Sequence, residues 1–250
     1  MPKSALNAFG RDGLVSLKNY FTYSLAGLLL SIVVVLLSLG LIGSVSGSGT
    51  TGSIGPGVVA AFAILFIIAL VAAAILGTYG ILSLMFGIRD IRRSTLKHSK
   101  DYASISQWLK YLVIVIIVVV SILIMLEIAN IASAYSSYGY SYSPSPYVGA
   151  IVAVTLVSLV LSAIWAWKLS SLYKLLCADL AKKDLYTAGT LLLVGIVVFI
   201  IADVIGLVFS VGSPTGTLTS TVVIFIDLVG MVIYLASLYL GMKGTSAALK

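Results

Sequence analysis

Six long apolar runs dominate this sequence and restrict its fold more than any other feature. An apolar run must reach about 20 residues to cross roughly 30 Å of hydrocarbon as a helix, and all six runs reach that length. They are Tyr20–Gly43, Val58–Ile88, Leu109–Ala134, Val148–Leu176, Gly189–Gly212 and Thr221–Met242. None shows the ten-residue alternation of a membrane barrel, so a helix is the structure that satisfies the backbone in lipid. The sequence therefore predicts an all-α integral membrane protein with six transmembrane helices.

The composition excludes a water-soluble fold and several classes of site. The 250 residues are 60% hydrophobic and 9% charged, whereas soluble domains carry about 25% charged residues. The single cysteine, Cys177, excludes an internal disulfide and a Cys-rich metal site. The single histidine, His98, excludes a His cluster. We therefore expect neither a metal site nor a cofactor.

The positive charges predict the orientation. Every Lys and Arg lies near the N-terminus, in the connection between the second and third runs or just inside the third (Lys110), at the end of the fourth run or in the connection that follows it, or towards the C-terminus. The three alternate loops, 44–57, 135–147 and 213–220, contain none. Because Lys and Arg remain on the cytoplasmic side, we expect three hairpins in the plasma membrane, with both termini in the cytoplasm and three uncharged loops outside. The net charge of +7 then reflects topology and not a nucleic-acid partner.

The predicted domain organisation is a leader followed by one membrane domain. Residues 1–19 form a basic cytoplasmic leader, and residues 20–250 form a single six-helix transmembrane domain. The leader is either a loose anchor, as Gly10 and Gly13 favour, or an amphipathic helix at the lipid headgroups. In the second case its apolar face consists of Leu6, Phe9, Val15 and Leu17. Simple in–out alternation is enough to explain the three hairpins, and the unequal spacing of the run onsets near 20, 109 and 190 argues against the alternative, a triplicated two-helix unit.

Three acids inside the runs form the candidate site. Glu127, Asp203 and Asp227 lie in the third, fifth and sixth runs, about 10–15 Å below the outer surface at 1.5 Å per residue. No Lys or Arg occurs in the outer half to pair with them. An ionised acid in the middle of the bilayer costs about 2.5–3.5 kcal/mol on insertion scales. The three acids therefore either bind a proton or a cation together, or remain neutral and form hydrogen bonds between helices.

Five tyrosines mark the second outer loop as a candidate contact surface. They are Tyr135, Tyr138, Tyr140, Tyr142 and Tyr147, interleaved with Ser, Gly and Pro. Tyrosine gives a large contact area at low entropic cost, which suits docking. The alternative is an outer aromatic belt that balances Trp108, Trp165 and Trp167 at the inner boundary. An acidic exterior would also explain why the outer loops carry no charge.

Smaller features have plain interpretations. Small residues recur four apart, as at Ala202 and Gly206, and serve either packing within the chain or contact with another subunit. In the basic connections, Asp179 and Lys183 are spaced for a helical ion pair. His98 is interpreted as a solvated residue, and Cys177 as inert packing.

Enzyme motifs are absent from the sequence. It contains no phosphate loop, no GxGxxG before a helix, and no HExxH, CxxC or GxSxG. A triad would have to use His98, which lies in a basic connection far from the acids. Asp203 and Asp227 could in principle form an intramembrane protease pair, but no motif surrounds them. We therefore predict that the protein is not an enzyme.

One stretch carries a resemblance to a known family. The segment LYTAG at 185–189, followed by LLLVG at 191–195 and by Gly206, resembles an uncharacterised family of archaeal multi-pass membrane proteins, known as a domain of unknown function. The resemblance covers about 60 to 130 residues. It implies an archaeal multi-pass membrane protein, and it brings no functional residues with it.

These observations favour a structural or accessory subunit of a membrane assembly. All five prolines lie outside the apolar runs, whereas transporters often interrupt their helices with Gly or Pro at mid-depth. The expected partners are the lipid bilayer and other membrane subunits, bound through the tyrosine-rich loop or the small-residue faces. The alternative is a small proton- or cation-coupled transporter or channel that uses the three acids.

Overall fold

The structure, a computed structural model, is almost entirely helical in the part of the chain that it describes. That part comprises residues 7–46, 56–94, 96–136, 148–212 and 216–250. It forms six helices: α1 (Ala8–Ser46), α2 (Pro56–Arg92), α3 (Ser99–Ser136), α4 (Val148–Leu180), α5 (Lys183–Gly212) and α6 (Gly216–Leu249). No strand occurs in these ranges. Each predicted run coincides with one helix, so the predicted all-α class is confirmed.

Five helices contain a described segment that is long and apolar enough to cross a membrane. These segments are Ile67–Arg92, Lys100–Leu123, Gly149–Leu180, Lys183–Val208 and Val222–Leu249. The remaining predicted span, 20–43, lies within α1, and many of its side chains are outside the described residues. Five candidate spans are compatible with a multi-pass membrane protein, and the sixth span stays a prediction.

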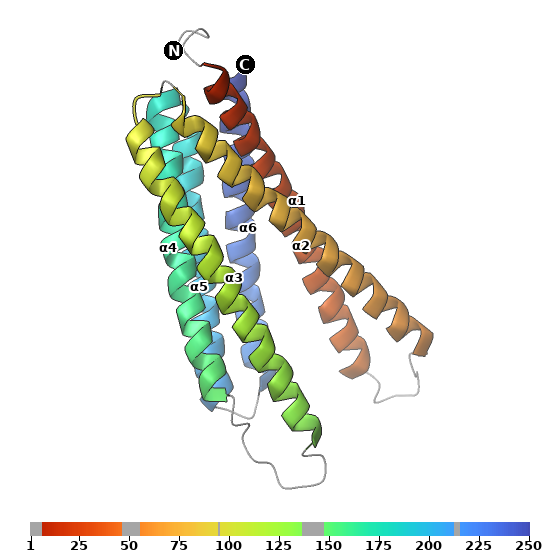
Figure 1. The fold of residues 1–250 in the computed structure, drawn as a ribbon. Helices are drawn as coiled ribbons and strands as arrows, with labels where there is room; N and C mark the ends of the chain where they lie inside the picture. Colours follow the sequence, from red (N-terminus) through yellow and green to blue (C-terminus); the bar gives the residue numbers. More distant parts are fainter. Residues whose placement is uncertain (1–6, 47–55, 95, 137–147, 213–215) are drawn as a thin grey trace. The chain divides into compact units, whose positions relative to one another are not determined.

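The chain divides into two compact units. The first unit contains residues 1–96 and 238–250, and the second contains residues 97–237. In the first unit α1 and α2 lie side by side (Figure 1). Their backbones approach closely because glycines face each other: a Cβ atom on Gly13 would lie 2.7 Å from the Ile91 side chain, and one on Gly87 would lie 3.0 Å from the Gly13 carbonyl oxygen.

The predicted leader is part of this helix pair. Helix α1 begins at Ala8 and runs without a break through the expected boundary at residue 20. Gly13, which we expected to weaken a helix, lies at the contact with α2. Of the predicted amphipathic face, Phe9 and Val15 are exposed, whereas Leu17 is fully buried against Gly87. Residues 8–19 are therefore the first part of α1 and pack against α2, whereas residues 1–6, with Leu6, lie outside the described residues.

In the second unit, burial is concentrated at one end of the helices. The largest fully buried side chains there are Tyr102, Leu109, Leu169, Leu172, Tyr173 and Leu176. Further along the same helices, large apolar side chains are exposed, including Ile114 and Met125 in α3 and Val160 in α4. Exposed apolar surface on this scale is compatible with helices that lie in a membrane.

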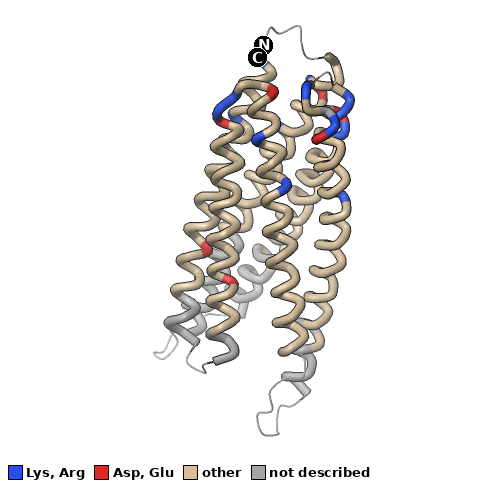
Figure 2. The backbone as a smooth tube through the Cα atoms, turned by 90° about the vertical axis from the view of Figure 1, so that its left-hand side faces the viewer, with Lys and Arg blue, Asp and Glu red and all other residues tan. Residues whose placement is uncertain are grey.

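The basic residues lie at the well-packed end of the helices (Figure 2). Figure 2 shows that within each unit the Lys and Arg positions gather at one end of the helices. In the second unit these positions belong to the start of α3, the end of α4 and the start of α5. The one-sided charge pattern of the sequence is thus reproduced in the arrangement of the helices.

Candidate functional site

Helices α5 and α6 pack closely enough to fix the relative heights of their side chains. Three pairs of neighbours lie across their interface: Gly195 with Tyr234, Phe199 with Gly230, and Gly206 with Val223. A step along α5 therefore corresponds to an equal step backwards along α6. The two backbones lie near each other here, since a Cβ atom on Gly195 would lie 3.4 Å from the backbone nitrogen of Tyr234.

This register brings two of the three predicted acids together. Asp203 lies opposite Ile226 and therefore beside Asp227, and the two carboxyl groups are close enough to interact electrostatically. Asp203 is exposed on the surface of the unit, and Asp227 is partly exposed. The sequence has no Lys or Arg between Lys183 and Lys243, so this helix pair offers the acids no basic side chain. Chemically, such a pair can share a proton, bind a cation or accept hydrogen bonds from a partner.

The third predicted acid cannot be assigned to the pair. Glu127 lies in α3, and its side chain is outside the described residues. Among the residues that are described, no group of three or more His, Cys, Asp or Glu side chains could hold a metal ion. A site shared by all three acids therefore stays a prediction.

The tyrosine-rich loop also falls largely outside the description. Tyr138, Tyr140, Tyr142 and Tyr147 lie beyond the described residues, and Tyr135 belongs to α3 without a described side chain. Both interpretations of this loop, a docking surface or an aromatic belt, stay predictions.

A third aspartate forms a polar cluster that the sequence analysis did not predict. The side chain of Asp179, at the end of α4, is 1% exposed. One of its oxygens lies 2.6 Å from Nδ1 of His98, and the other accepts a hydrogen bond of 2.8 Å from the Tyr102 hydroxyl. Both carboxylate oxygens thus have a partner. We call this set the Asp179 cluster.

Local structure explains why these three residues meet. The backbone amides of Asp101 and Tyr102 both donate to the carbonyl oxygen of His98, which closes the first turn of α3. His98 and Tyr102 therefore lie on one side of that turn. On α4, Asp179 follows the buried stripe of Leu172 and Leu176, and this spacing carries its carboxylate towards α3.

The cluster corrects two predictions. His98 is not a solvated residue, because its ring contacts a buried carboxylate and its side chain is 29% exposed. The predicted helical ion pair between Asp179 and Lys183 is wrong, because α4 ends at Leu180 and α5 begins at Lys183. A single acid on the leucine stripe of an amphipathic segment was the signal that could have identified the cluster.

The fold and these sites define a class: an all-helical protein whose long apolar helices are compatible with a multi-pass membrane location. Comparison with known proteins goes no further. No family model matches the chain, and neither a curated protein nor a solved structure matches it. The resemblance to an archaeal membrane family therefore stays a prediction.

Proposed function

We propose that this protein is a non-enzymatic multi-pass membrane protein that serves as a structural or accessory subunit of a membrane assembly. The observation that supports this proposal is the position of Asp203, exposed on the α5–α6 pair beside Asp227. An exposed acid within a membrane span is costly unless a polar partner covers it. Since α5 and α6 offer no base between Lys183 and Lys243, a helix from another subunit supplies that partner.

The proposed setting is the plasma membrane, with six spans, both termini in the cytoplasm and three uncharged loops outside. The tyrosine-rich loop, 135–147, and the small-residue helix faces are further candidate contacts with partner subunits. Orientation can be tested directly because Cys177 is the only cysteine. After Cys177→Ser, single cysteines at Ser145 and at Lys97, an exposed position in the connection between α2 and α3, should react from outside and from inside, respectively, with a membrane-impermeant maleimide. The reverse pattern would invert the topology.

A second function is favoured by one specific observation. Two carboxyl groups at the same height on neighbouring helices, with no base on either helix nearby, also suit a proton- or cation-coupled transporter or channel. In that case Asp203 and Asp227, with Glu127 as the third group, bind the transported ion. The two functions differ in what neutralises the acids: a partner subunit or a mobile cation.

One pair of experiments separates these functions. For the subunit function, the protein purified from its native membranes in mild detergent should carry a stoichiometric membrane partner that has a Lys or Arg in a span. That partner should be lost from the Asp203→Asn/Asp227→Asn double variant and retained by Asp12→Asn, a control at an exposed acid of α1.

For the transport function, the purified wild-type protein should conduct protons or cations in liposomes without a partner. The triple variant with Glu127→Gln, Asp203→Asn and Asp227→Asn should then lose that flux. A protein that is monomeric in its native membranes and conducts in liposomes would refute the subunit function. A protein that shows no proton or cation flux in liposomes and carries a stoichiometric partner would refute the transport function.

A further inference from the structure

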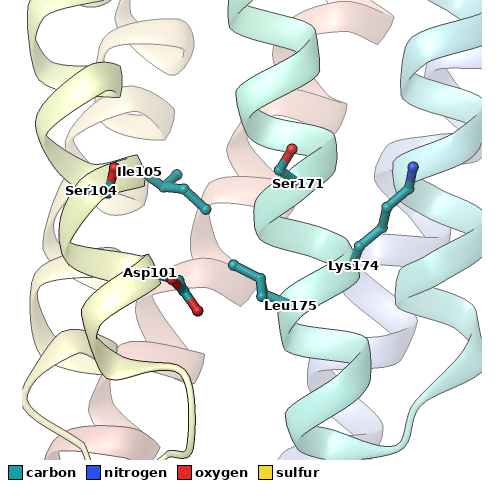
Figure 3. A pocket seen from close by; sticks show the side chains of 6 residues that line it. All are labelled: Asp101, Ser104, Ile105, Ser171, Lys174 and Leu175. Atoms are coloured by element: carbon teal, nitrogen blue, oxygen red, sulfur yellow. The ribbon is translucent and has the colours of Figure 1, made fainter.

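An open groove lies between the first turns of α3 and the last turns of α4. Its volume is about 460 Å³, and it is lined by Asp101, Ser104, Ile105, Ser171, Lys174 and Leu175. Figure 3 shows Ile105 and Leu175 reaching into the space between the two helices, with Asp101 close to Leu175. Lys174 lines the groove with its aliphatic chain and turns its ammonium away from α3, towards the Tyr186 ring at 5.8 Å. The groove thus combines an apolar floor with hydroxyl and carboxylate groups.

One helical turn further towards the apolar part of the helices, a lysine lies between two indoles. The Lys168 ammonium is 5.0 Å from the Trp108 ring centre and 5.6 Å from that of Trp167. Cation–π attraction holds the ammonium in this position. Trp108 and Trp167 are 51% and 63% exposed, so both indoles present apolar surface to the surroundings. Such exposed indoles are typical of a membrane interface.

The groove and the lysine form one continuous surface. On α3 the residues Asp101, Ser104 and Trp108 follow the three- and four-residue spacing of one helix face. On α4 the residues Lys168, Ser171 and Leu175 do the same. Asp101 and Trp108 are seven residues apart on α3, a rise of about 10 Å along the helix. Because the Lys168 ammonium contacts the Trp108 ring, Asp101 lies about that far from Lys168 along the helix axis. Along the helix axis, the order is indole, ammonium, hydroxyl, carboxylate.

We infer that this surface binds a glycerophospholipid. Its phosphate lies between the Lys168 ammonium and the Ser104 hydroxyl, and its acyl chains lie along Trp108 and Trp167. The Ser171 hydroxyl already donates to the Trp167 carbonyl oxygen at 2.9 Å, so it accepts a hydrogen bond from the headgroup. A headgroup hydroxyl or ammonium beyond the phosphate donates to Asp101.

A phospholipid presents these groups in the same order as the surface does, with chains, phosphate and headgroup donor in sequence. A free phosphate ion would leave the indoles and Asp101 without a partner. A purely apolar molecule would leave the ammonium and the Ser104 hydroxyl without one. This site rests on the membrane location of the protein, and it is independent of whether the protein is a subunit or a transporter.

The test measures binding of phosphatidylglycerol to the delipidated full-length protein in detergent by native mass spectrometry. Loss of a charge-assisted hydrogen bond to the phosphate should weaken binding about tenfold in Lys168→Gln. The matched control is Lys110→Gln, which removes the same charge from an exposed lysine of α3 outside the groove, and it should bind as the wild type does. Lys168→Arg keeps the charge and should retain most of the affinity, which excludes a folding defect as the cause.

Three outcomes would overturn the inference. Equal losses in Lys168→Gln and Lys110→Gln would indicate general attraction to positive charge. Equal binding of a diacylglycerol with the same chains would show that the phosphate is not recognised. Displacement of the lipid by millimolar inorganic phosphate or glycerol phosphate would indicate an anion site that does not require acyl chains.

Discussion

Aspartate side chains have opposite surroundings in two regions of the second unit. Near the charged end, Asp179 is buried, and each of its two oxygens has a partner within the unit. In the apolar part of α5 and α6, Asp203 and Asp227 lie beside each other, and their helices provide no base there. The first arrangement is complete within the unit. The second leaves carboxyl groups for something outside it.

These two environments indicate what each aspartate contributes. A buried carboxylate with all of its hydrogen bonds made holds helices together, because removing it leaves buried donors without partners. An exposed carboxyl group in a span contributes little to the fold, because even hydrogen bonds between membrane helices are weak on average. We therefore expect Asp179 to matter for stability, and Asp203 and Asp227 to matter for function.

The largest expected effect is that of Asp179→Ala. Breaking a buried charged cluster should lower the free energy of unfolding by about 3 kcal/mol, because the Tyr102 hydroxyl and the His98 ring both lose their acceptor. Unfolding in mixed micelles by titration with sodium dodecyl sulfate measures this change. Asp12→Ala, at an exposed acid of α1, serves as the control and should change stability by less than about 0.5 kcal/mol. Equal effects of the two variants would contradict the contrast between the regions.

Tyr102→Phe should have the next largest effect. It removes the 2.8 Å hydrogen bond to Asp179 and retains the packing of the ring, so we expect a loss of about 2 kcal/mol, typical of a bond to a charged acceptor. Tyr111→Phe is the matched control, since Tyr111 lies on the same helix and is 67% exposed. A loss in Tyr111→Phe as large as that in Tyr102→Phe would show that the Asp179 bond has no special role. The same titration compares the two variants.

The acids of α5 and α6 should behave in the opposite manner. Asp203→Asn/Asp227→Asn should change the free energy of unfolding by only about 0.6 kcal/mol per site, the average for hydrogen bonds between membrane helices. The same double variant should abolish partner binding or ion flux, whichever the protein performs. A stability loss comparable to that of Asp179→Ala would show that these acids are structural, and the contrast between the two regions would then disappear.

The sequence predicted the helices well and the Asp179 cluster not at all, for one physical reason. Helices in lipid follow from the length and hydropathy of single segments, so the run 148–176 was sufficient to locate α4. The Asp179 cluster depends on the register of α3 against α4. Its partners are far apart in the sequence: Asp179 is 81 residues from His98 and 77 residues from Tyr102. The four-residue spacing predicted an ion pair between Asp179 and Lys183 because it assumes one continuous helix, whereas α4 ends at Leu180 and α5 begins at Lys183.

Asp203 and Asp227 could be predicted from the sequence in part: their depth could, but their proximity could not. Their depth could be counted from the outer loops, because the rise per residue of a helix is fixed. Their proximity depends on the glycine contacts between α5 and α6, above all Gly195 and Gly230. The sequence analysis singled out the nearby pair Ala202 and Gly206 as a packing motif, but neither Gly195 nor Gly230, and it did not identify which helices would pack. The Glu127 side chain lies outside the described residues, so its place beside the other two acids stays a prediction.

The smallest expected effect concerns the turn that follows Asp179. Ala181 has φ 53°, a left-handed conformation that costs a residue with a side chain about 1 kcal/mol and that glycine adopts freely. Ala181→Gly removes this strain but adds freedom to the unfolded chain, so the net gain in stability should be about 0.5 kcal/mol. Ala178→Gly, at an exposed position inside α4, should instead lose about 1 kcal/mol. A gain in the first variant and a loss in the second would show that α4 ends at Leu180, directly after Asp179. Losses in both variants would mean that the helix continues past Leu180.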